Sequence, residues 1–153
     1  MRRQFFSYLA LAMVLAFSHT AASAVYANEG QRDYSHLYAD QYAQKVFVQE
    51  KITEFFPTTY RTMLAIASCE STGLIHWLPD GTLRPHDAGA SSAAGVFQVL
   101  LGLHRDEIQS LGLDMSNPDD YFTFVRHLHD RNSNPFSDWN ASRHCWQTRL
   151  AQK

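Results

Sequence analysis

The apolar positions before Pro57 recur at helical spacing and predict a helix from residue 39 to residue 55. The expected inner stripe of this helix consists of Tyr42, Val46, Gln49, Ile52 and Thr53. Pro57 ends the helix, because proline cannot continue it, and the same residue suits the first turn of the helix that follows.

A second helix is expected from residue 58 to residue 71. Met63, Ile66, Ala67 and Glu70 follow the spacing i, i+3, i+4, i+7, so they share one face. Glu70 therefore lies on the apolar face in the last turn of this helix, next to Cys69.

The chain after Gly73 is rich in proline and glycine and reads as a loop to residue 95, with a small hairpin at the sequence PDGT. A short apolar piece, residues 95–101, carries one polar residue, Gln98. A short helix is expected at residues 104–111.

Asn117 and Pro118 open another predicted helix, with a capping residue followed by proline and two acidic residues. Its inner face is Phe122, Val125 and His129, and it ends near residue 131. A last short helix or turn is expected at residues 139–146. The fold class is mainly α, in one domain with a small loop and hairpin region, and with residues 25–38 as a flexible N-terminal arm before a domain at 39–153.

The first 24 residues have the pattern of a secretory signal peptide. Arg2 and Arg3 precede an apolar run of about a dozen residues, too short for the ~20 needed to span a bilayer. Cleavage is expected after Ala24, with Ala27 as the second choice. The alternatives are a membrane anchor or a buried helix. Cleavage predicts a periplasmic or secreted protein of 129 residues with no stable membrane insertion.

Loss of the two leader arginines changes the net charge from −2 to about −4. The remaining chain has no basic run that could neutralise phosphates, which argues against nucleic acid as a partner.

Two cysteines, Cys69 and Cys145, remain after cleavage. In an oxidising compartment such a pair normally forms a disulfide. A catalytic thiol or an intermolecular bond are the alternatives, although a cysteine nucleophile needs a positioned histidine and none adjoins Cys69.

Glu70 is the candidate for chemistry. Burial in an apolar wall disfavours the charged carboxylate and raises its pKa, which is what a general acid needs near neutral pH. Alternatively, Glu70 forms a salt bridge with an arginine or reaches solvent from the helix end.

In order, the segments AIASCES, GLIHW, PDGTLRP, SSAAGVFQV, LGLD and DWNASRHCW resemble the lysozyme-like superfamily. The chain is most similar to the soluble lytic transglycosylase domain and the resuscitation-promoting-factor-like muralytic domains. The resemblance covers residues 58–146 and implies a lysozyme-like fold. The cysteine beside the glutamate and the late cysteine near a tryptophan also resemble the disulfide of the resuscitation-promoting-factor type.

The resemblance implies a role for each matching residue. Glu70 matches the catalytic acid, and Ser71 matches the serine that helps to set the site. Gln98 matches a glutamine that lines the glycan cleft. Asn140 would face the substrate, and Trp139 would replace a tyrosine, which keeps an aromatic face but loses a hydroxyl. The sequence departs from the family at Asp120-Tyr121, and residues 77–90 do not align.

The implied activity is cleavage of the β-1,4 bond between N-acetylmuramic acid and N-acetylglucosamine in peptidoglycan, by a monomer that uses one glutamate as acid and then base and needs no metal or cofactor. Envelope-assembly proteins are candidate further partners. The alternatives are a hydrolytic lysozyme, for which Asp80 or Asp87 would be the second carboxylate, and an inactive glycan-binding or envelope-assembly module.

Other candidates have plainer interpretations. His127 and His129 are two residues apart and point to different sides of a helix, so they cannot share a metal. His76 and His104 either line the cleft or pack, and Trp77 and Trp146 are expected in the core or against the disulfide.

Overall fold

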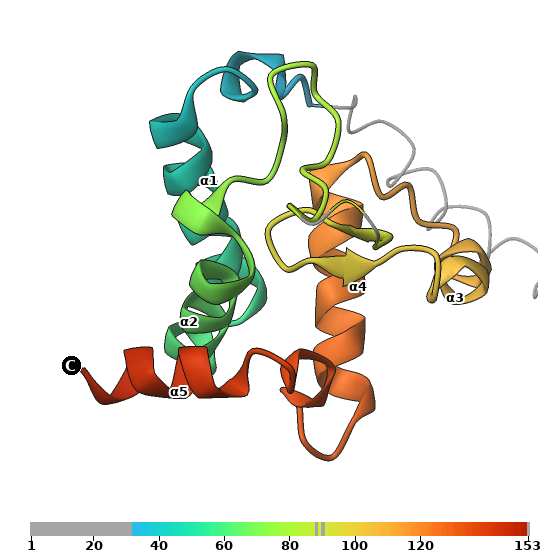
Figure 1. The fold of residues 1–153 in the computed structure, drawn as a ribbon. Helices are drawn as coiled ribbons and strands as arrows, with labels where there is room; N and C mark the ends of the chain where they lie inside the picture. The colour runs from blue at the N-terminus through green and yellow to red at the C-terminus, as the bar shows by residue number, and fades with distance from the viewer. Residues whose placement is uncertain (1–31, 88, 90, 153) are drawn as a thin grey trace, which may run out of the picture. The chain divides into compact units, whose positions relative to one another are not determined.

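The computed structural model describes residues 32–87, 89 and 91–152, and the described helices and strands all belong to the unit Tyr34–Lys153. The predicted signal peptide lies outside the described residues. Within them, the unit is mainly helical, with one small antiparallel sheet and one disulfide (Figure 1). No described helix combines the length and apolar character needed to cross a bilayer.

The first two long helices are α1 (Gln41–Phe55) and α2 (Tyr60–Glu70), which lie side by side (Figure 1). Asp40 caps α1, since its carboxylate accepts hydrogen bonds from the backbone N–H groups of Tyr42 and Ala43 at 2.9 and 3.0 Å. Pro57 lies between the two helices, as predicted.

The predicted inner stripe of α1 was wrong except at Ile52, which is fully buried, and Thr53 is exposed. Tyr42 is 76% exposed and Val46 36% exposed, whereas the buried residues of α1 are Gln44, Val48, Lys51 and Ile52. The polar members of this buried face tolerate burial because they are paired: Gln44 bonds the backbone of the segment after α2, and Lys51 forms an ion pair with Asp119 of α4.

The inner face of α2 agrees with the prediction, because Met63, Ile66 and Ala67 are fully buried. After α2, the 3-10 helix η3 (Thr72–Leu74) turns the chain at Gly73, which has a φ of +76°. The expected hairpin at PDGT is also present as an antiparallel bridge between Trp77 and Leu83.

The sheet pairs β1 (Ala93–Ala94) with β2 (Val99–Leu100), and residues 95–98 form the turn between them. The short helix α3 (Arg105–Ser110) follows, and then α4 (Pro118–Arg131), whose start is capped by Asn117 as predicted. The predicted inner residues of α4 are buried: Phe122, Val125 and His129.

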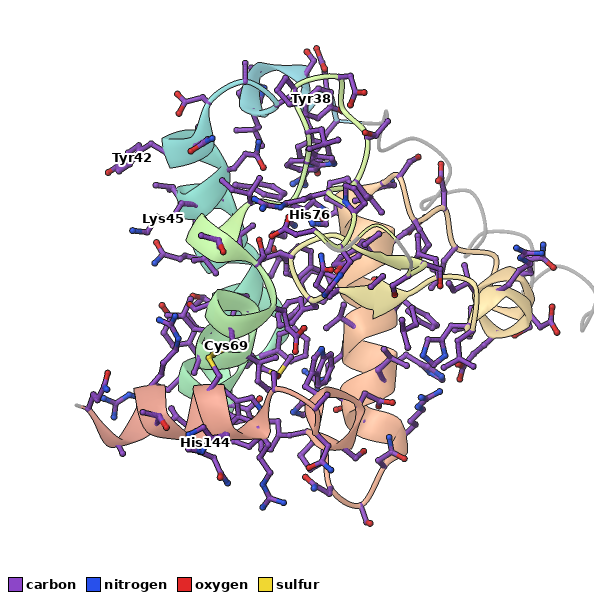
Figure 2. The ribbon with its side chains drawn as sticks, viewed as in Figure 1. Tyr38, Tyr42, Lys45, Cys69, His76 and His144 are labelled. Carbon is purple, nitrogen blue, oxygen red and sulfur yellow. A yellow bond between two sulfur atoms is a disulfide. The ribbon has the colours of Figure 1, made fainter. Side chains whose placement is uncertain are left out.

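The C-terminal region differs from the single element expected at residues 139–146. It is divided into the 3-10 helix η4 (Ser137–Trp139) and α5 (Arg143–Ala151). Trp139, the last residue of η4, is buried, and its indole N–H donates to the carbonyl oxygen of Phe97 in the hairpin turn. Helix α5 then crosses α2 near Cys69, where the disulfide Cys69–Cys145 joins them (Figures 1 and 2).

The end of the predicted N-terminal arm packs against the rest of the unit. Residues Ser35–Leu37 form the 3-10 helix η2, in which Leu37 is buried. The rings of Tyr34 and Tyr38 lie 6.0 and 5.4 Å from that of Trp77.

Candidate active site

Glu70 is the last residue of α2 and is partly buried. Its neighbour Cys69 is bonded to Cys145 of α5, and the two Cα atoms are 6.1 Å apart. The carboxylate therefore stands on a helix end whose position relative to α5 is fixed by a covalent bond.

The environment of Glu70 favours its neutral form. Burial raises the pKa of the Glu70 carboxyl above its ordinary value, and this effect exceeds the opposing ones. The Ser142 hydroxyl and the positive charge that His86 carries when protonated both lower the pKa, because each stabilises the carboxylate. The Ser142 hydroxyl also donates to the carbonyl oxygen of Trp139 at 3.2 Å. A carboxyl group of this kind holds its proton to a higher pH than a solvated glutamate and can donate it as a general acid.

The hairpin turn is held by the hydroxyl of Tyr121. This hydroxyl donates to the carbonyl oxygen of Ala94 and accepts from the backbone N–H of Phe97, both at 3.0 Å. Burial raises the pKa of Tyr121, and the negative charge of Glu70 adds to that shift. Tyr121 is therefore a neutral hydrogen-bonding group between the hairpin turn and the site of Glu70.

Gln98 occupies the end of the turn in a left-handed conformation, with a φ of +50°. Its Nε2 donates to the carbonyl oxygen of Gly95 at 2.9 Å, and its Oε1 is buried without a hydrogen-bond partner among the described residues. A strained backbone and an unsatisfied amide oxygen are typical of functional positions, because surrounding structure must maintain both.

The segment from Trp139 to Ser142 closes the other side of the site. The indole Nε1 of Trp139 donates to the carbonyl oxygen of Phe97 at 3.1 Å, which joins this segment to the hairpin turn. Trp146 donates in turn to the carbonyl oxygen of Trp139 at 3.1 Å. Asn140 is exposed at the surface of this segment.

Two of the predicted substrate-binding residues are buried. Trp139 is 4% exposed, so its ring packs in the core and supports the turn that precedes Gln98. Ser71 is 2% exposed, and its hydroxyl donates to the carbonyl oxygen of Ile75 at 2.7 Å. In the structure these side chains support the segments around Glu70 and do not present an open face.

Sequence reasoning did not single out Ser142 or His86. Ser142 follows Asn140 by two residues and lies inside the motif DWNASRHCW that carries the resemblance. Its position in that motif could have indicated that it lies near the site. His86 lies in a loop that returns to the sheet through a hydrogen bond from its backbone N–H to the carbonyl oxygen of Ala93 at 3.1 Å. No local pattern indicates that this return places its charge where it affects Glu70.

The two aspartates considered as second carboxylates have other partners. Asp80 accepts hydrogen bonds from the backbone and hydroxyl of Thr82, which lower its pKa and define it as a turn residue. Asp87 is exposed and pairs with Arg84 at 3.0 Å.

The other histidines do not meet at the site. His76 is fully buried, accepts a hydrogen bond from the backbone N–H of Val96 at 3.2 Å, and packs edge-on against Trp77 and Tyr121. Trp77 and Trp146 are buried, as expected. His129 lies on the buried side of α4, 3.1 Å from the hydroxyl of Thr59.

His104 and His127 converge on Glu107 rather than on Glu70. Their ring nitrogens lie 3.1 and 2.8 Å from the carboxylate, and Arg131 donates to both of its oxygens at 2.8 Å. Partial burial would raise the pKa of Glu107, but these hydrogen bonds outweigh it and hold the pKa at about 2. Among the described residues, no group of three or more His, Cys, Asp or Glu side chains could hold a metal ion.

No protein-family model, curated protein or solved structure matches this chain. Its own residues therefore carry the case for its function.

Proposed function

We propose that the protein is an exported lytic transglycosylase with a lysozyme-like fold, which cleaves the β-1,4 bond between N-acetylmuramic acid and N-acetylglucosamine in peptidoglycan. The observation that carries the proposal is the environment of Glu70: a partly buried carboxyl with a raised pKa, at a helix end joined to α5 by a disulfide. The motif resemblance supplies the substrate class.

In the proposed reaction, Glu70 first donates its proton to the glycosidic oxygen as the bond from that oxygen to the anomeric carbon breaks. The resulting Glu70 carboxylate then removes the proton of the muramic 6-hydroxyl, whose oxygen bonds to the same anomeric carbon. The product is a 1,6-anhydro sugar, and Glu70 is protonated again. Proximity makes the intramolecular attack competitive with water.

Two features favour one carboxylate over two. Among the residues that the structure describes, the charged group that affects the pKa of Glu70 is His86, and Asp80 and Asp87 are engaged with Thr82 and Arg84 instead. A hydrolase with paired carboxylates would need its second group within about 5–9.5 Å of the first, where its charge would raise the pKa of Glu70 further. Ser142 and His86 instead stabilise the carboxylate that forms after the first proton transfer.

Export is part of the same proposal. A disulfide is typical of an oxidising compartment, and residues 1–24 have the pattern of a signal peptide.

Digestion of purified peptidoglycan, followed by mass spectrometry of the fragments, tests the proposal. Anhydromuramic ends are the expected product. Reducing ends would instead identify a hydrolytic lysozyme. The absence of any product from folded, oxidised protein would contradict enzymatic activity and favour a glycan-binding or assembly module.

A further inference from the structure

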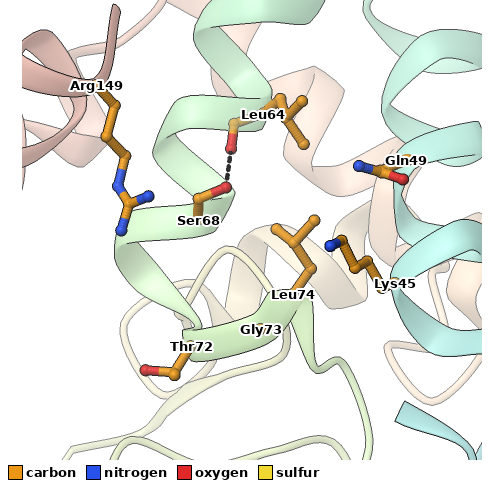
Figure 3. Close-up of a pocket in the computed structure, with 8 residues that line it drawn as sticks. All are labelled: Lys45, Gln49, Leu64, Ser68, Thr72, Gly73, Leu74 and Arg149. Carbon is orange, nitrogen blue, oxygen red and sulfur yellow. Dashed lines mark hydrogen bonds between the residues drawn. The ribbon is translucent and has the colours of Figure 1, made fainter. Parts of the chain in front are cut away.

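A groove lies between α1, α2 and α5 (Figure 3). Its volume is about 370 Å³. The residues that line it are Lys45, Gln49, Leu64, Ser68, Thr72, Gly73, Leu74 and Arg149. Ser68 and Glu70 point about 200° apart around α2, because each residue of a helix advances by about 100°. The groove is therefore on a different side of α2 from the candidate active site.

Two cations flank this groove. Lys45 comes from α1 and Arg149 from α5, and they lie on opposite sides of Leu64 and Ser68 (Figure 3). No acidic residue is among those that line the groove, and neither cation forms an ion pair within the described part of the chain. Arg149 donates from Nε to the sulfur of Cys69 at 3.2 Å, which orients its guanidinium. On a chain with a net charge of −2, this is a local positive site.

An exposed stripe of α1 that carries two large apolar side chains, Tyr42 and Val46, runs beside the groove. Tyr42, Lys45, Val46 and Gln49 follow the spacing i, i+3, i+4, i+7 and so share one face of α1. Tyr42 is 76% exposed and Val46 36% exposed, and Figure 2 shows Tyr42 and Lys45 pointing outward from this helix. Inside the groove, partly buried Leu64 adds further apolar surface, while Leu74 is buried in the wall. Large exposed apolar side chains that adjoin a groove are typical of interaction surfaces.

We propose that this surface, formed by the groove and the exposed stripe of α1, binds an acidic amphipathic peptide segment of a partner protein. Carboxylates of the segment pair with Lys45 and Arg149, and apolar side chains pack on Tyr42 and Val46. A phosphate ligand would satisfy the two cations but would leave the exposed stripe unused, so the mixture of charge and apolar surface favours a peptide. The inference goes beyond the proposed function and does not depend on Glu70.

An NMR titration of the oxidised protein tests this inference. The probe is an acetylated nonapeptide in which Glu and Leu alternate, and its matched control has Gln in place of every Glu. The acidic peptide should shift the backbone signals of α1 and of residues 68–74. Lys45→Gln and Arg149→Gln should each weaken binding roughly two- to fivefold, and Tyr42→Ser should weaken it as well. Arg105→Gln, on the exposed side of α3, should leave binding unchanged, as should Glu70→Gln.

Several results would overturn the proposal. Equal binding of the Gln peptide, shifts that lie elsewhere on the protein, or no shifts at millimolar peptide would each exclude the acidic segment. A free tripeptide of the peptidoglycan stem, which carries two carboxylates, is a second probe. If this tripeptide binds and the nonapeptide does not, the groove binds the cell wall itself. If dilution of the protein alone moves the same signals, the occupant is a second copy of the chain. If Arg149→Gln lowers thermal stability and no peptide binds at the groove, the role of Arg149 is to stabilise the C-terminal end of α2.

Discussion

Gly95 lies against the ring of Tyr121 so closely that a Cβ at residue 95 would be 2.7 Å from three atoms of that side chain. Gly95 also has a φ of +71°, a backbone conformation that residues other than glycine rarely adopt. Tyr121 holds the turn through two hydrogen bonds, so this contact sets the geometry of the turn that carries Gln98.

Gly95→Ala should therefore be much more destabilising than Gly112→Ala. Gly112 has a similar φ of +67° but has open space around it. Gly112→Ala, the matched control, should lower the free energy of unfolding by roughly 1–2 kcal/mol, the cost of the backbone conformation alone. Gly95→Ala should lower it by roughly 2–5 kcal/mol, because the clash with Tyr121 adds to that cost. Urea unfolding measures both. Equal losses would mean that the contact with Tyr121 is unimportant.

The disulfide should contribute more to stability than to chemistry. Cys69 and Cys145 are separated by 76 residues, and closure of such a loop stabilises the fold by roughly 4–5 kcal/mol in the chain-entropy model. The double variant Cys69→Ala/Cys145→Ala should lower the free energy of unfolding by an amount of this order. At a temperature where the variant remains folded, its rate of cleavage should stay close to wild type. A rate reduced a hundredfold in the folded variant would show that the thiols or their bond take part in the reaction.

Ser142→Ala should move the pH profile of cleavage. The interaction with Ser142 stabilises the Glu70 carboxylate and lowers its pKa, so the loss of the Ser142 hydroxyl should raise that pKa further. Because the general acid must be protonated, activity falls as pH rises through the pKa of Glu70, and this alkaline limb should shift to higher pH in the variant. The profile of kcat/KM against pH provides the measurement. A limb that stays in place or moves to lower pH would contradict the assigned role of Ser142.

Buried His76 should make the fold sensitive to mild acid. Burial lowers the pKa of His76 from 6.5 to about 3. Between these values the unfolded chain binds a proton at this residue and the folded chain does not, so stability falls as pH decreases. The loss approaches roughly 4–5 kcal/mol at pH 3. The depressed pKa of Glu107 adds a loss of the same sign, but only below about pH 4.5.

Urea unfolding between pH 7 and pH 5 isolates the contribution of His76. His76→Gln should flatten the dependence of the free energy of unfolding on pH in this range, whatever its effect on stability at pH 7. The exposed His144→Gln variant is the matched control and should keep the wild-type slope. An unchanged slope in His76→Gln would show that His76 is not the group responsible.

The helices α2 and α4 could be predicted from the sequence, because their apolar residues repeat at helical spacing and their ends carry capping or stop residues. The same spacing located Glu70 on the inner face of α2. Helical spacing failed for the inner face of α1, where the buried residues Gln44 and Lys51 are polar and find partners on distant segments. The spacing that runs through Tyr42 and Val46 selected a neighbouring stripe of α1 and also missed buried Val48. Periodicity alone cannot show which polar residue of a helix is buried, because that depends on a partner far along the chain.

The candidate site was predictable only in part for a similar reason. Glu70 and Gln98 belong to motifs that can be read locally. The influence of His86 and Ser142 on Glu70 depends on the return of the loop to the sheet and on the position of the chain between η4 and α5. The buried state of Trp139 likewise depends on its hydrogen bond to Phe97, 42 residues away.

The central claim is that Glu70 is the acid and then the base of the proposed reaction, and Glu70→Gln tests it most directly. The substitution keeps the size of the side chain and removes the proton that it would donate. The release of fragments from purified peptidoglycan should fall to the background of a no-enzyme control, while the circular dichroism spectrum and the midpoint of thermal unfolding stay close to wild type. Retention of full cleavage activity by the folded variant would contradict this role of Glu70.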